Sequence, residues 1–253
     1  MKQFTARHPW AILAAGAAIQ ILTGLPAAWG VFQQPVMDEF SLTEDGAGYA
    51  FGILIAAFGV GCVIGGFLQD KKGPRCAALW GTGLLCGGFF AAALLPGEKG
   101  AWFWAVFSIP AGLGTAFLYP SIQSCAQKWY AGRKGLATGV IGGAVGLSGA
   151  FLTGFVRTAL KGFGPVQGIR GAFWALGAPT LPVCLVGSAL LTDPPPAKQK
   201  PEEQGRGKGT PSLDLAPLQM LRTKQYWLCA GAVCCSTPAV LLFSPIILKL
   251  GME

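Results

Sequence analysis

The residues best placed to do chemistry in this sequence are charged residues in the break between two long apolar stretches. Gly66 is followed four residues later by Asp70 and then by Lys71, and Arg75 comes directly after Gly73-Pro74. Gly-Pro is typical of a tight turn, so Asp70 would end one helix and Arg75 would begin the next. An acid at the carboxyl end of a helix opposes the helix dipole unless it has a partner. The pattern favours an ion-pair partner for Asp70, and ordinary turn chemistry is the alternative.

A second group consists of polar and aromatic residues inside or near the end of the apolar stretches, namely Gln20, Trp29, Tyr119 and Gln123. In lipid a buried amide or phenol needs a partner, so such residues face the interior of a helix bundle or a wet cavity. They are therefore candidates for lining a substrate cavity. For Trp29, a place in the interfacial aromatic belt is an equal alternative. For Gln20, the alternative is a hydrogen bond to a neighbouring helix.

Enzyme chemistry has little support in the sequence. His8 is the only histidine, and the eight cysteines form no Cys-x-x-Cys pair. Most of these cysteines lie in apolar stretches and have the character of small hydrophobic residues. No Ser-His-Asp set and no metal-ligand cluster is present, and no stretch holds paired acids. We therefore expect a protein that is not an enzyme and that binds neither a metal nor a cofactor.

Seven long stretches of the sequence contain no Asp, Glu, Lys or Arg. Helices formed by these stretches would position the loop charges and the cavity candidates. Of the 253 residues, 52% are hydrophobic and 12% are charged, whereas soluble domains carry about 25% charged residues. Each stretch has roughly the 20 residues with which a helix crosses a bilayer, and none alternates as barrel strands do. The stretches are 10–31, 49–68, 77–95, 101–121, 136–156, 172–191 and 226–248. The sequence therefore predicts an all-α, multi-pass protein whose helices contact the lipid bilayer.

The basic residues are divided unequally between the two sides of such a protein. With the N-terminus in the cytoplasm, fourteen Lys and Arg residues fall in inside segments and five fall in or beside outside loops. Because cytoplasmic loops carry the excess of Lys and Arg, this predicts a cytoplasmic N-terminus in the inner (plasma) membrane. The net charge of +8 is thus explained by short loops, and no nucleic-acid partner is expected.

One connection is much longer than the others. Residues 192–225 are polar, charged and rich in Pro and Gly, which is typical of a linker. We expect three parts: a six-helix bundle over 1–191, a cytoplasmic linker over 192–225, and a seventh helix, the start of another half, within 226–253. This layout resembles that of major-facilitator transporters, whose six-helix halves are each built from 3+3 inverted repeats. The resemblance implies five further spans and a missing C-terminal half.

Three loops carry this resemblance. The segment from Gly66 to Arg75 resembles the major-facilitator loop signature, in which the acid and the basic residues form a charge cluster that holds the cytoplasmic side shut. Residues 126–139, AQKWYAGRKGLATG, are similar to the loop between helices four and five of the oxalate/formate antiporter family. Residues 221–227, LRTKQYW, are similar to the start of helix seven in that family. The resemblance implies exchange or import of small carboxylates by alternating access.

The fifth stretch is rich in glycine. Small residues four apart let two helix backbones approach closely. General membrane packing and a place at the interface between the halves are compatible interpretations. The glycines concerned are Gly135, Gly139, Gly142, Gly143 and Gly146.

The resemblance also bears on the substrate. Tyr119 matches a tyrosine in the family's fourth helix and is our best single candidate for the cavity. Family members often carry Tyr-Ala-Trp in helix one, where this chain has Ala27-Ala28-Trp29 and so lacks one tyrosine. No Lys or Arg lies within a stretch of this half, so the cation that would pair with a buried carboxylate is expected in the C-terminal half.

The sequence thus predicts the N-terminal half of a secondary transporter for small organic anions, without naming the anion or the coupling ion. Two alternatives stay open. One is a truncated, inactive fragment, and the other is a membrane subunit or sensor that does not transport.

Overall fold

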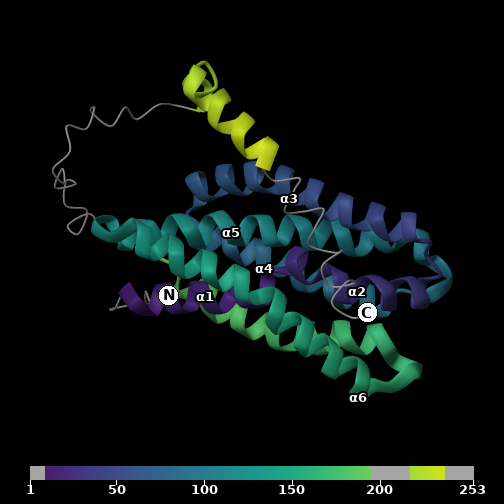
Figure 1. Ribbon diagram of the computed structural model, residues 1–253. Helices are drawn as coiled ribbons and strands as arrows, with labels where there is room; N and C mark the ends of the chain where they lie inside the picture. Colours follow the sequence, from purple (N-terminus) through teal and green to yellow (C-terminus); the bar gives the residue numbers. More distant parts are fainter. Residues whose placement is uncertain (1–8, 195–216, 237–253) are drawn as a thin grey trace. The chain divides into compact units, whose positions relative to one another are not determined.

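The computed structural model describes residues 9–194 and 217–236, and the chain divides into two compact units, Met1–Gln199 and Lys200–Glu253. Figure 1 shows the chain coloured along its sequence. Every regular element among the described residues is a helix. The described residues of the first unit contain six helical segments long and apolar enough to cross a membrane. The all-α class expected from the sequence is therefore confirmed.

The first span is a broken helix. Helix α1 covers Pro9–Thr23 and helix α2 covers Leu25–Phe40, with Gly24 between them at φ −76° and ψ 46°. Pro26 follows at the second position of α2, and a proline has no backbone N–H to continue the helical hydrogen bonds. The span as a whole runs from Pro9 to Phe40, well beyond the uncharged stretch.

The next three spans are α3 (Glu44–Lys72), α4 (Pro74–Leu94), and a π-helical turn η2 (Trp104–Ser108) that continues into α5 (Ile109–Trp129). Short 3-10 helices precede and follow that fourth span, as η1 (Gly97–Trp102) and η3 (Ala131–Arg133). Thr43 caps α3, because its hydroxyl accepts a hydrogen bond from the Gly46 N–H at 3.1 Å.

Helix α6 covers Lys134–Leu190; with η3 before it, it forms the fifth span, 131–162, and it also contains the sixth, 168–190. A straight helix of 57 residues would be about 85 Å long, more than twice the roughly 30 Å hydrocarbon core of a bilayer. Figure 1 shows that the ribbon of α6 instead turns back on itself. Accordingly, Ser148 in its first half contacts Gly24, and Leu191, directly after its end, contacts Arg75.

The six spans form two groups of three, spans one to three and spans four to six. The first span of each group packs against the second and third spans of the other group. Helix α5 contacts α3 and α4 extensively, and α1 contacts both halves of α6. Contacts between α4 and α6 join the two sets. Gly114 of α5 lies so close to α4 that a Cβ would stand 2.5 Å from the Leu85 nitrogen. This exchange is the arrangement expected of two structural repeats.

An aromatic cluster fills the core at the end of the bundle opposite the N-terminus. Six phenylalanines from the first, third, fourth and sixth spans have ring centroids 4.9 to 6.3 Å apart. Each such pair adds about 0.5–1.5 kcal/mol beyond the burial of its area. The cluster consists of Phe32, Phe40, Phe89, Phe103, Phe107 and Phe173, all almost fully buried.

The described part of the second unit is short. It contains α7 (Pro217–Met220) and a helical segment over residues 224–236. The indole of Trp227 donates to the Leu221 carbonyl at 2.9 Å, and the Thr223 hydroxyl donates to Met220. The seventh predicted span, 226–248, is helical as far as residue 236, and its remainder lies outside the described residues.

Candidate functional site

The charged loop between α3 and α4 is a one-residue turn. Gly73 adopts φ +83°, a conformation that favours glycine, and its N–H donates to the Gln69 carbonyl at 2.7 Å. Pro74 begins α4 at once. The turn leaves Asp70 and Lys71 exposed in the last turn of α3. A Cβ at Gly66, one turn earlier, would meet nothing within 4 Å.

Arg75 is engaged away from Asp70. Its Nε donates to the carbonyl oxygen of Leu191 at 3.1 Å, and the side chain is half-buried. The carboxylate of Asp70 takes part in none of the ion pairs seen among the described residues. The loop thus presents its acid outward while its arginine holds the end of the sixth span.

Three residues at that end, Leu191, Thr192 and Asp193, form what we call the linker strap. Lys128 Nζ lies 2.9 Å from Asp193 Oδ1, and the Trp129 indole N–H donates to the Thr192 carbonyl. The Cys125 thiol donates to the same carbonyl at 3.4 Å.

The linker strap therefore ties the start of the linker to the ends of the third and fourth spans. Sequence reasoning did not find it, because Lys128 and Asp193 are 65 positions apart. The available signal was an acid directly after the sixth uncharged stretch, on the side where basic residues collect.

Two of the four cavity candidates lie in the interior of the six-span unit. Gln20 is 1% exposed; its Oε1 accepts from the Thr23 hydroxyl at 3.0 Å, and its Nε2 has no partner among the described residues. Trp29 is 3% exposed and stacks on Phe51 of α3, with centroids 5.6 Å apart. Thr23 and Phe51 were not singled out in the sequence, since hydroxyl and aromatic residues are common in apolar spans.

The other two candidates lie on α5, one helical turn apart. Tyr119 and Gln123 are both half-buried, so they reach the surface of the unit. The Tyr119 ring lies 6.3 Å from that of Phe58 on α3, and Gln123 Oε1 has no partner among the described residues. Pro120 lies within the helix between them and removes one backbone hydrogen bond there.

The glycines singled out in the fifth span do not contact the other described helices. A Cβ built on Gly135, Gly139, Gly142, Gly143 or Gly146 would meet nothing within 4 Å. Large apolar neighbours on this helix, including Leu136 and Leu147, are exposed. Inside the unit the close approach is made by Gly149, whose Cβ would lie 3.2 Å from Ala27. The six-span unit therefore leaves this face of α6 open.

Within residues 9–194 and 217–236, no three His, Cys, Asp or Glu side chains gather as a metal site would require. All eight cysteines are unbridged.

Comparison with known proteins finds a matching family and several relatives. A family model described as Major Facilitator Superfamily matches residues 11–253. The chain is 24% identical over 209 residues to the oxalate:formate antiporter of Oxalobacter formigenes, covering 82% of this chain and 47% of that protein. It is 25% identical over 225 residues to an uncharacterized MFS-type transporter, YhjX, of Escherichia coli, covering 88% and 53%.

Monocarboxylate transporter 9 of Mus musculus is 28% identical over 204 residues, covering 76% of this chain and 38% of that protein. The chain thus spans about half the length, or less, of these relatives.

Proposed function

Because the chain belongs to the major facilitator superfamily, we propose that it forms the N-terminal half of a secondary transporter for small carboxylates, working by alternating access. The observation that carries the proposal is the open face of the six-span unit. Exposed apolar side chains of α3 and uncontacted glycines of the fifth span offer a surface on which a second bundle can pack. In this proposal the chain is a transporter component and not an enzyme.

The substrate class is supported by the relatives. An oxalate:formate antiporter and monocarboxylate transporters are named for small carboxylates, and they match most of this chain. Carboxylates need a cation or several hydrogen-bond donors when they leave water. Since the membrane-crossing cores of this half lack Lys and Arg, the cation is supplied by the C-terminal half in our proposal.

The proposed cavity wall in this half is the face of α5 that carries Tyr119 and Gln123. Both side chains are half-buried, and the Tyr119 hydroxyl and the Gln123 amide can donate hydrogen bonds to a carboxylate. Gln20 and Trp29 lie deeper in the unit, on α1 and α2. A site at this level agrees with the midplane position of transporter sites.

The proposed gate lies at the turn between α3 and α4. Asp70 is exposed, so it is available to a cationic partner on the C-terminal half, and Lys71 is exposed beside it. Arg75 keeps the turn attached to Leu191 while the halves rock. Breaking and remaking the Asp70 pair opens and closes this side.

We assign this side to the cytoplasm and the membrane to the inner membrane. The described basic residues Lys71, Lys72 and Lys128 lie at this end, whereas Asp38 and Glu39 lie at the other. This charge asymmetry supports a cytoplasmic N-terminus.

Exchange of labelled formate, oxalate and lactate in proteoliposomes tests the proposal. The chain joined to a C-terminal half is expected to exchange at least one of them, and the chain alone is expected to exchange none. Failure of the joined protein with all three carboxylates would overturn the substrate class. Exchange by the chain alone would show that two copies replace the two halves.

A further inference from the structure

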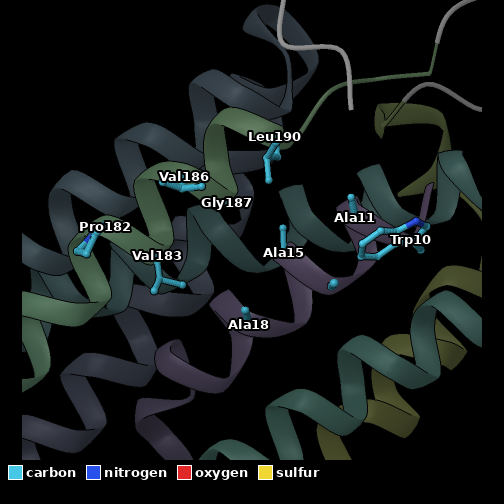
Figure 2. Close-up of a pocket in the computed structure, with 10 residues that line it drawn as sticks. Trp10, Ala11, Ala15, Ala18, Pro182, Val183, Val186, Gly187 and Leu190 are labelled. Atoms are coloured by element: carbon cyan, nitrogen blue, oxygen red, sulfur yellow. The ribbon is translucent and has the colours of Figure 1, made fainter. Parts of the chain in front are cut away.

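A groove runs along the outside of the six-span unit between α1 and the last turns of α6. It has a volume of about 540 Å³. Figure 2 shows its lining residues on the two helices. Its floor on α1 is made of four alanines, and its wall on α6 is aliphatic. The lining residues are Trp10, Ala11, Ala14, Ala15, Ala18, Pro182, Val183, Val186, Gly187 and Leu190.

The groove occupies only one leaflet. On α1 it extends from Trp10 to Ala18, and on α6 from Leu190 to Pro182. Each segment has nine residues, and the ends of a nine-residue helix are about 12 Å apart, which is close to half of the roughly 30 Å hydrocarbon core. The groove therefore opens at the end of the bundle that carries the N-terminus and stops near the middle of the membrane.

Beyond that depth the same spans are in contact. At the floor of the groove itself the helices already touch, because a Cβ at Gly187 would lie 2.6 Å from Ile19 Cδ1. Further along, Phe32 stacks on Phe173 with centroids 6.0 Å apart, and Arg170 Nε lies 2.8 Å from Glu39 Oε1. A partner helix that crossed the membrane would need a seat along the whole span, whereas a chain of one lipid needs only one leaflet.

The mouth of the groove suits a phospholipid. Trp10 is 65% exposed and lines the mouth, and indole rings favour the headgroup level. Leu190 lines it from α6, and the guanidinium of Arg75 binds the carbonyl of the next residue, Leu191. The cationic side chain of Arg75 is thus bound one residue beyond the end of the groove, and below Trp10 the groove is lined by aliphatic residues and Gly187 alone.

We propose that this groove binds one acyl chain of a phospholipid from the leaflet on the N-terminal side. The inference rests on the membrane placement in the proposed function but not on transport. The alanines of α1 leave the room for the chain, and Val183 and Val186 contact it from α6. The bound lipid fills the seam between the first and sixth spans.

Phosphatidylglycerol with a photoreactive diazirine in its acyl chain tests this in proteoliposomes of the full chain. After illumination, mass spectrometry of peptides is expected to place the label on residues 11–18 and 182–190 above the level on exposed Val63 of α3. Ala14→Phe with Ala18→Phe, both at exposed positions, should abolish this excess.

The matched control is Leu185→Phe, which adds an aromatic ring at an exposed position outside the groove and should keep the excess label. If the double variant does not fold, Ala14→Leu takes its place. Label equal to that on Val63, or unchanged in the groove variants, would overturn the proposal. Labelling of the groove does not depend on transport. If the groove is labelled but the exchange assay fails, only the proposed function is refuted.

Discussion

Ser148 of the fifth span packs directly on Gly24 at the break of the first span. The Ser148 hydroxyl lies 2.5 Å from the Val145 carbonyl and 3.5 Å from the Gly24 carbonyl, and it is fully buried. A Cβ added at Gly24 would overlap the Ser148 side chain. The break in the first span is therefore shaped by a neighbour 124 positions away in the sequence.

Gly24→Ala is expected to destabilise the six-span unit by about 1–3 kcal/mol, because overpacking forces the backbones apart. Adding Ser148→Gly should recover most of that loss, since the space for the new methyl group returns. Thermal unfolding in detergent measures both variants. Equal instability of the single and the double variant would contradict the contact.

The linker strap should add little stability through its ion pair. Lys128 and Asp193 have side chains 45% and 43% exposed, so Asp193→Asn should cost less than about 1 kcal/mol. Trp129→Phe removes the indole donor to the partly buried Thr192 carbonyl and should cost about 1 kcal/mol or more. Denaturation midpoints compare the two, and a larger loss for Asp193→Asn would reverse our ranking.

Asp70→Asn should lower exchange in the protein joined to a C-terminal half while leaving folding unchanged, because Asp70 is exposed and forms no ion pair among the described residues. Asp45→Asn is the control, since Asp45 is an exposed acid at the opposite end of the same helix. Initial exchange rates measure both. Equal rates for Asp70→Asn and the parent protein would remove the gating role.

Tyr119→Phe and Gln123→Leu should each raise the KM for a carboxylate by about five- to tenfold, which corresponds to one lost hydrogen bond of about 1 kcal/mol or more. Tyr49→Phe provides the control, because Tyr49 is 72% exposed near the start of α3. The contrary result is an unchanged KM for both variants, which would move the cavity wall away from this face of α5.

The spans could be predicted because lipid tolerates few charged groups, so long uncharged stretches mark the crossing helices. The residues at which these helices end could not be predicted from the sequence. The first stretch ends at residue 31, yet α2 continues to Phe40, since helical hydrogen bonds extend past the apolar core into polar surroundings. The break at Gly24 was also missed, although Pro26 stands beside it. Nothing in an apolar run marks such a break, because contacts with other helices offset the free-energy cost of the lost helical hydrogen bonds.

The partners of the candidate site were harder to predict than its members. Asp70 and Arg75 lie close in sequence and suggested mutual pairing, but Arg75 binds Leu191, which is 116 positions away. Local spacing cannot foresee such a contact, because it depends on how the third and sixth spans pack. The burial of Gln20, in contrast, agrees with the prediction, because an amide in an apolar span turns away from lipid.

The membrane threading of the six spans is the claim on which all others depend, and epitope tags in the full chain test it directly. Tags placed after Ser41, Gly132 and Gly162 would be probed with antibodies in intact and in opened cells. We expect Ser41 and Gly162 on the outside and Gly132 on the inside. Accessibility of all three tags from the same side would contradict the threading.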